Sequence, residues 1–164
     1  MGVVNNIPIR AAERLASRLS WAAAENIHVV DKPHLPDFGP HDIEVQVCMG
    51  ALNYVAQAVF SGRLKIAVWV KHNKDRVGDT DAALTNTTDG LGILAEDIRN
   101  VMNGTYLSGT LLSPLTVDTA FSAPEANDDV VMCWQDYTFD VLTAMPTAAL
   151  DSQGTDPDIG EPEA

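Results

Sequence analysis

Two separate segments in which apolar and polar side chains alternate constrain the fold of this chain more than any other feature. In residues 63–71 the large aliphatic side chains share one parity: Leu64, Ile66, Val68 and Val70. Lys65 and Lys71 have the opposite parity. In residues 129–143 one parity again gathers apolar side chains: Val131, Cys133, Tyr137, Phe139 and Val141. Because successive side chains of a strand point to opposite faces, both segments are predicted to be strands with one buried and one wet face.

The residues before the first of these segments predict a helix and a connector. Apolar residues recur at helical spacing over Pro8–Glu25, which is predicted to be an amphipathic helix that begins near its proline. The connector Ile27–His41 contains three prolines, and only its piece His28–Val30 is predicted to be extended.

Three consecutive segments are predicted to form an antiparallel meander. The first is the strand Ile43–Met49, which Gly50 ends. The second is the apolar segment Ala51–Phe60, which periodicity alone does not assign and for which a strand is favoured. The short link Ser61–Gly62 joins the second segment to Arg63–Lys71.

A long loop and a second helix follow the meander. The loop His72–Thr88 is polar and longer than loops that merely connect, so a functional or mobile loop is expected. The helix Asp89–Asn103 is predicted to be capped by Thr88 or Asp89 and to be stopped by Gly104 in a left-handed conformation.

Together these elements predict a single α+β domain over residues 1–150. It consists of an antiparallel sheet of about four to five strands, with a mixed sheet left open, and two main helices packed on one face. A short extended piece at Leu115–Val117 and a turn-rich link at Pro124–Asp128 complete it. The last fourteen residues, Asp151–Ala164, contain five acids and no base, and they are predicted to be a tail that is disordered unless a partner orders it.

The composition excludes several classes of protein. A formal net charge of −13 argues against a surface that neutralises nucleic-acid phosphates, because such a surface needs clustered Lys and Arg. No run approaches the roughly 20 apolar residues that span a bilayer, and the first residues lack a secretory pattern, so no membrane association and an intracellular origin are expected. Cys48 and Cys133 lie in apolar strand patterns and are predicted to be buried free thiols.

The connector histidines are the strongest candidates for chemistry. His28, His34 and His41 alternate with aspartates, and imidazole and carboxylate are ligands that zinc accepts. Their spacing of six and seven residues, across prolines, suits a metal site poorly. A surface or interface connector is therefore favoured over a metal site.

The aspartates of the long loop match no known cation site. Asp75, Asp79 and Asp81 lack the spacing and the trailing glutamate of an EF-hand loop, so a solvated loop is favoured. Neither a nucleophile elbow, a P-loop nor a dinucleotide fingerprint occurs in the sequence. We therefore predict a protein that is not an enzyme and uses no cofactor.

A strip of arginines marks the first predicted helix. Arg10, Arg14 and Arg18 recur every four residues and carry three of the ten positive side chains. One interpretation is an ordinary solvated helix face. The other is a strip that docks on an acidic patch of a neighbouring copy, which makes these arginines, with Asp75, Asp79 and Asp81, the candidate contacts with subunits or partners.

The order of the predicted elements resembles that of the tail terminator and related neck proteins of tailed bacteriophages. The resemblance lies in the amphipathic first helix, a strand like Leu64–Val70, a helix like Leu91–Met102 and a closing strand like Trp134–Leu142. It implies a virion protein, assembled in the host cytoplasm, that forms a homo-oligomeric ring, usually a hexamer. Such a ring caps the tail tube, contacts the tube protein and the head-side connector or stopper, and lets DNA pass without specific binding. An acidic channel suits that passage.

Other functions stay open at this point. In the same class, the chain could be an adaptor or stopper nearer the head. From other classes, it could be a small metal-binding protein or enzyme that uses His28, His34 and His41, or an acidic ligand-binding module of ferredoxin-like shape.

Overall fold

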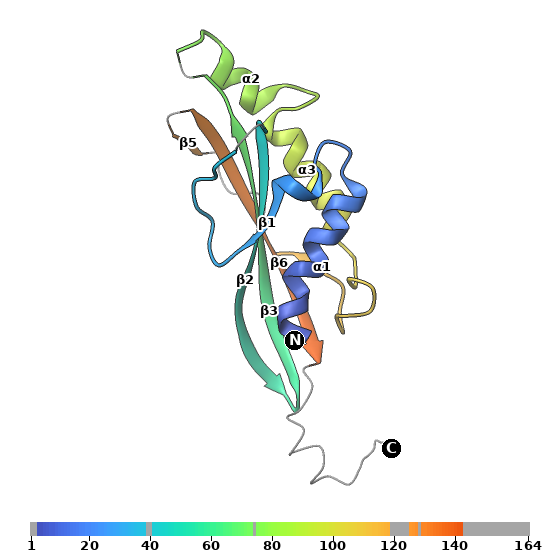
Figure 1. The fold of residues 1–164 in the computed structure, drawn as a ribbon. Helices are drawn as coiled ribbons and strands as arrows, with labels where there is room; N and C mark the ends of the chain where they lie inside the picture. Colours follow the sequence, from blue (N-terminus) through green and yellow to red (C-terminus); the bar gives the residue numbers. More distant parts are fainter. Residues whose placement is uncertain (1–2, 39–40, 74, 119–124, 128, 143–164) are drawn as a thin grey trace.

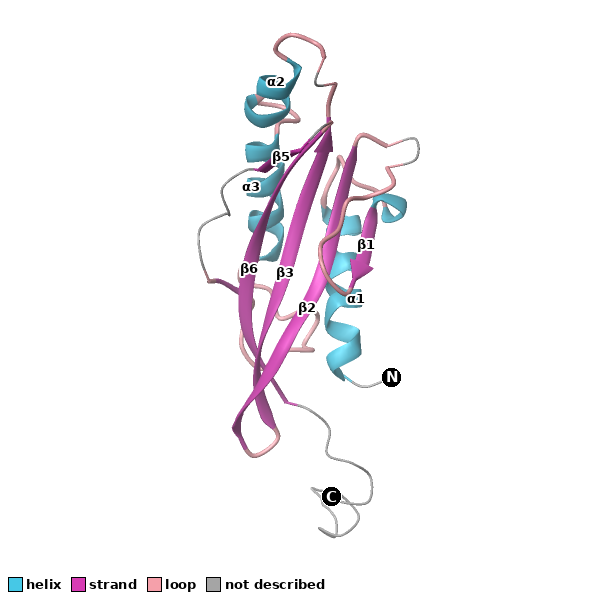
Figure 2. Ribbon diagram, turned by 90° about the vertical axis from the view of Figure 1, so that its left-hand side faces the viewer, coloured by secondary structure: helices cyan, strands magenta, loops and turns pink. Residues whose placement is uncertain are grey.

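A mixed, mostly antiparallel sheet of six strands forms the centre of the molecule (Figures 1 and 2). The computed structural model describes residues 3–38, 41–73, 75–118, 125–127 and 129–142. Three long strands lie side by side: β2 (Ile43–Ala56), β3 (Val59–Lys71) and β6 (Val130–Leu142). Three short strands flank them: β1 (Ile27–Val30), parallel to β2, and β4 (Thr116–Val117) and β5 (Glu125–Asn127), both antiparallel to β6.

Two main helices pack on one face of this sheet, α1 (Val3–Arg18) and α3 (Leu91–Met102) (Figure 2). A third, shorter helix, α2 (Asp79–Thr85), lies at the end of the sheet where β3 stops, and the single turn η1 (Ala24–Asn26) precedes β1. The predicted α+β fold is confirmed, and β1 is the strand that makes the sheet mixed. In the described part of the chain, no helix is long and apolar enough to cross a bilayer.

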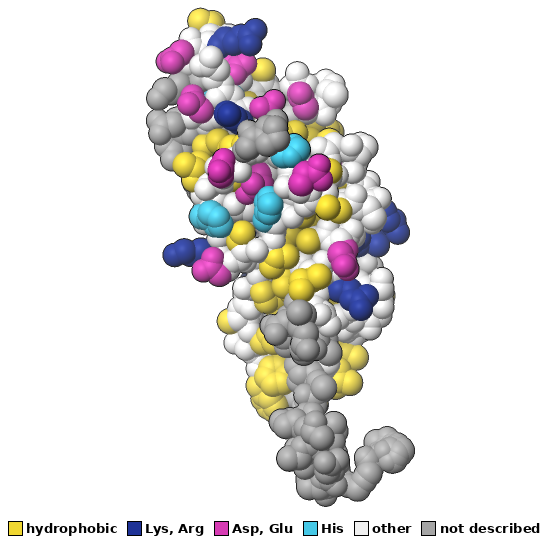
Figure 3. Space-filling view, in the orientation of Figure 1, with side chains coloured by type: hydrophobic (Ala, Val, Ile, Leu, Met, Phe, Trp, Pro, Cys, Tyr) yellow, Lys and Arg dark blue, Asp and Glu magenta, His cyan; other side chains and the backbone are white. Residues whose placement is uncertain are grey.

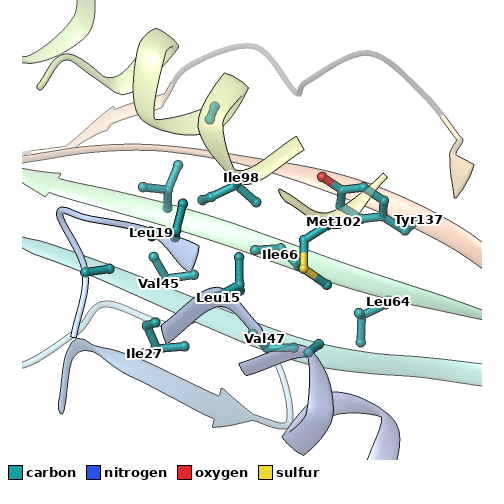
Figure 4. Packing of buried hydrophobic residues seen from close by; sticks show 14 of the residues in the cluster. Leu15, Leu19, Ile27, Val45, Val47, Leu64, Ile66, Ile98, Met102 and Tyr137 are labelled. Carbon is teal, nitrogen blue, oxygen red and sulfur yellow. The ribbon is translucent and has the colours of Figure 1, made fainter. Parts of the chain in front are cut away.

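The main core lies between these helices and the sheet (Figure 4). It gathers side chains from both layers, among them Leu15 and Leu19 of α1, Ile98 and Met102 of α3, and Val45, Val47, Leu64, Ile66 and Tyr137 of the sheet. The predicted apolar parities of β3 and β6 are therefore confirmed, since both face the helices. The apolar residues of α3 reach this core together because residues three and four positions apart lie on the same side of a helix.

The opposite face of β3 is not simply wet, and that prediction was wrong. Ala67 and Trp69 are buried there in a second cluster with Val130 and Met132 of β6. The cause is the connector between β1 and β2, because its Phe38 packs against this cluster. Sequence alternation identifies the two faces of a strand, but it does not show that a loop covers the second face.

The first helix lies closer to the N-terminus than predicted. It begins at Val3, with Pro8 inside it, and ends at Arg18 rather than at Glu25. Beyond that end the Trp21 indole Nε1 donates to Asp97 Oδ2 of α3 at 3.0 Å. Near this contact the chain turns and then enters β1.

Two predicted strand boundaries were also wrong. Gly50 does not end a strand, because β2 continues through it to Ala56. The pairing with β3 shifts between Met49 and Leu52, which is the signature of a bulge and the reason that glycine is accepted at that point. The hairpin turn lies at Gln57–Ala58, and the predicted link Ser61–Gly62 belongs to β3.

The remaining corrections concern the loops. The polar segment 72–88 contains α2, and the N-cap of α3 is Gly90 instead of Thr88 or Asp89. Gly104 is left-handed, with φ 89°, as predicted. Residues 125–127 of the predicted link Pro124–Asp128 form strand β5. The first and last residues of that link, and the acidic tail 151–164, lie outside the described residues.

Candidate docking surfaces

At the lower end of the sheet in Figure 1 the tip of the β2–β3 hairpin projects past both main helices, and we call residues 49–62 of this hairpin the arm. From Val45 to Gly62 the sequence holds no charged residue over eighteen positions. Large apolar side chains nevertheless face solvent on the arm, with Tyr54 70% exposed and Val55 56% exposed. In Figure 3 the lower end accordingly shows hydrophobic and uncharged side chains, while charged ones gather higher on the molecule.

The outer edge of the arm has no strand partner in the part of the chain that the structure describes. β1 pairs with β2 only as far as Cys48, so the backbone of β2 beyond it presents a free edge. An uncharged free edge is a ready template for pairing with another chain. This surface does not follow from a strand that stops at Gly50, although the uncharged run around Gly50 was the available signal.

A groove beside α1 holds the three predicted arginines. Its cavity volume is about 320 Å³, and its walls are α1 and a turn of the segment after α3: Arg10, Glu13, Arg14, Ser17, Arg18, Leu107 and Ser108. Arg10 and Arg18 are exposed. No ion pair joins either of them to a described residue. We call this the arginine groove.

Arg14 differs from its two neighbours in the strip. Its Nε donates to the carbonyl oxygen of Val101 at 2.8 Å, which fastens α1 to the last turn of α3. Partial burial, followed by the charge of Arg18, lowers the pKa of Arg14 from its ordinary value. The interpretation of the three arginines as an ordinary solvated helix face therefore does not hold for Arg14.

The turn opposite α1 has an unusual backbone. Leu107, Ser108 and Gly109 are consecutive left-handed residues with φ of 49°, 57° and 81°. Leu107 is buried, and its N–H donates to Thr105 Oγ1 at 3.1 Å, so the turn is anchored in the core. Left-handed conformations cost energy for residues other than glycine and persist only where the surroundings enforce them.

The predicted acidic contacts lie at the other end of the molecule, around α2 (Figure 1). Asp79 Oδ2 accepts from the Asn73 backbone N–H at 2.6 Å, and Asp75 and Asp81 are exposed nearby. A recess of about 240 Å³ beside them is lined by Asp42, Asp79 and Asp89 among others. The structure therefore separates the acidic and arginine candidates instead of joining them in one site.

The connector histidines do not form a metal site. His28 Nε2 lies 3.5 Å from Glu44 Oε1, and His34 Nδ1 lies 3.1 Å from the carbonyl oxygen of Lys32. The backbone N–H of His41 donates to Phe38 at 3.0 Å. Within the described ranges, no group of three or more His, Cys, Asp or Glu side chains is placed to hold a metal ion.

A buried glutamine holds the connector against the sheet, and the sequence analysis did not identify it. Gln46 Oε1 accepts from the His34 backbone N–H and from Trp69 Nε1, both at 3.1 Å. Gln46 Nε2 donates to the His34 carbonyl at 2.8 Å and to Glu44 Oε2 at 2.9 Å. All four hydrogen-bonding positions of the amide are used, so this network is structural in character.

The two cysteines are buried free thiols, as predicted. Burial raises the pKa of Cys48 to about 11 and that of Cys133 to about 12. Because the thiolate is the reactive form, neither cysteine is suited to act as a nucleophile near neutral pH.

Comparisons with known proteins add little to this geometry. No protein-family model and no curated protein matches the chain. A solved structure named Np_888769.1 is similar, with a TM-score of 0.47 and 17% identity over 84% of this chain and 95% of that chain. At this level of similarity two chains need not share a fold, and the name states no activity.

Proposed function

We propose that this chain is a structural subunit that assembles with copies of itself into a closed ring, in the manner of the phage tail terminator and neck proteins that its sequence resembles. The observation that carries the proposal is the arm, an uncharged projection with exposed Tyr54 and Val55 and a free strand edge. An apolar projection of this kind is costly to leave in water, which favours a partner that covers it.

A ring requires each subunit to present two different surfaces, one for each neighbour. The arginine groove and the acidic residues around α2 provide two such surfaces of opposite charge, and the arm adds an apolar contact. In the proposed virion setting the ring caps the tail tube and contacts the tube protein and the head-side connector. The net charge of −13 fits a channel through which DNA passes without binding.

The self-assembly part of the proposal is tested by changing the arm. The full chain is compared with the variant Val55→Lys by analytical ultracentrifugation and negative-stain microscopy. We expect the unchanged chain to form closed rings as its concentration rises, and Val55→Lys to shift the population to monomer, because a lysine in the contact must lose its hydration.

The matched control is Leu35→Lys, since Leu35 is 61% exposed, close to the 56% of Val55, but lies in the connector between β1 and β2, away from the arm and from α2. This variant should assemble like the unchanged chain. A chain that stays monomeric both alone and with a tail-tube protein would contradict the proposal. Genes for head–tail joining or tube proteins next to this one would support the virion assignment, and their absence would count against it.

A further inference from the structure

We propose that the acidic C-terminal segment of the chain, residues 151–164, docks in the arginine groove of the same molecule. The segment carries five acids and no base: Asp151, Asp156, Asp158, Glu161 and Glu163. The groove presents three arginines and one acid, Glu13. The chemistry that joins them is recognition of carboxylates by guanidinium groups.

The groove leads to the place where the described chain ends. A second recess, of about 370 Å³, shares Arg10 with the arginine groove and continues along the same turn: Asn6, Arg10, Gly109, Thr110, Leu111, Leu112 and Leu142. Leu142 is the last residue of β6. The two recesses therefore adjoin each other at Arg10, between the end of β6 and Arg18.

Two of the charges along these recesses have no ion-pair partner among the described residues. Arg10 and Arg18 are exposed and form no ion pair with a described residue, although the chain has a net charge of −13. Arg14 also lines the groove, and its hydrogen bond from Nε to the Val101 carbonyl leaves the two Nη groups available as donors. Unpaired arginines next to one another favour the binding of an anionic segment.

The length of chain is sufficient for docking within one molecule. Eight residues lie between Leu142 and Asp151, and the nine Cα–Cα steps that join them span up to about 30 Å in an extended chain. Arg10 and Arg18 are eight residues apart on one helix, which corresponds to about 12 Å. The acids can therefore reach every arginine of the strip without a second copy.

Docking in this way would close the arginine groove to other acidic surfaces. The segment would then compete with any acidic patch of a neighbouring copy, and a free subunit would be restrained from associating through the groove. This consequence rests on the proposed ring, whereas the docking itself does not.

Photocrosslinking tests the docking in the full chain. Ser152 is replaced by a benzophenone amino acid, the protein is irradiated at about 10 mM salt, where screening lengths are about 30 Å, and crosslinks are mapped by mass spectrometry. We expect crosslinks to α1 and to the turn at 107–112. In the variant Arg10→Glu/Arg18→Glu they should fall roughly tenfold, as expected when two surface ion pairs become repulsive.

The control is Arg76→Glu, an exposed arginine near α2, which should leave the crosslinks unchanged. Circular dichroism confirms that each variant is folded. Mixing isotopically heavy and light copies separates crosslinks within one molecule from those between molecules. Crosslinks spread over the whole surface, or ones that survive the charge reversal, would overturn the docking, and crosslinks found only between copies would overturn its assignment to the same molecule.

Discussion

Single residues in the arm control how closely its strands approach. Gly62 of β3 lies opposite Leu52 of β2 and Phe139 of β6. A Cβ atom at Gly62 would lie 2.5 Å from Leu52 Cδ2 and 2.8 Å from Phe139 Cζ. Both distances are shorter than contacts that real Cβ atoms make, so the absence of a side chain lets three strands pack tightly at this point.

Gly62→Ala should therefore destabilise the fold by about 1–3 kcal/mol, because Phe139 is buried and has little room to move. The free energy of unfolding in urea measures the effect. The control is Gly92→Ala in α3, where the nearest contact of a new Cβ is Leu84 O at 3.8 Å. That change should stabilise by up to about 1 kcal/mol, since alanine favours helix. Equal stability of Gly62→Ala and the unchanged chain would contradict the packing described.

Other residues show where sequence patterns stop being informative. Cys48 and Cys133 were predicted correctly as buried thiols, because cysteine in an apolar strand pattern is usually a core residue. Gln46 has the parity of a wet face, yet it is completely buried. Its burial depends on the connector that lies over it, and no local pattern reports a contact with a residue twelve positions away.

At the scale of elements, the packing of α1 on α3 gives the three arginines of α1 different roles. Arg10, Arg14 and Arg18 look equivalent in the sequence, being spaced by four. Only Arg14 reaches a backbone carbonyl of α3, and it is also the most buried of the three. The end of α3 at Met102 places that carbonyl within reach, which the arginine spacing by itself does not specify.

We expect Arg14→Ala to cost about 1–2 kcal/mol, because it removes a bond from a charged donor and the packing of its aliphatic stem. Arg10→Ala and Arg18→Ala should each change stability by less than about 0.5 kcal/mol, as exposed substitutions usually do. Thermal or urea unfolding of the three variants provides the comparison. Equal losses at all three positions would show that Arg14 does not fasten α1 to α3.

Element boundaries were predicted less well than the elements themselves. Gly50 predicts the end of a strand, but glycine in a strand also permits a bulge that lets pairing continue. The polar composition of residues 72–88 predicts a loop, yet Asp79 and Asp81 lie in the first turn of α2, where negative charge is favourable. In both cases the residue type was informative and the tertiary pairing chose between two local structures.

At the scale of the whole molecule, both main helices and the sheet share one core. Nothing in that core separates α1 from α3, so the described chain should unfold as a single unit. Tryptophan fluorescence and far-ultraviolet circular dichroism should give coincident urea transitions, since Trp21 contacts the helical layer while Trp69 and Trp134 belong to the opposite face of the sheet.

Leu15→Ala extends this test. Leu15 is fully buried between α1 and the sheet, and its truncation should lower stability by about 2–5 kcal/mol in both signals together. A variant in which the circular dichroism transition moves while the fluorescence transition does not would indicate that α1 unfolds separately, against a single cooperative core.

Periodicity and residue type over short distances are enough to predict the class of fold, the apolar faces of β3 and β6, the helix α3 and the buried thiols. Tertiary structure decided the rest: the burial of the second sheet face, the continuity of β2 through Gly50, the different role of Arg14 and the projection of the arm beyond the helices. Each of these depends on what lies next to a residue in space, and the free energy of those long-range contacts outweighs the local preference.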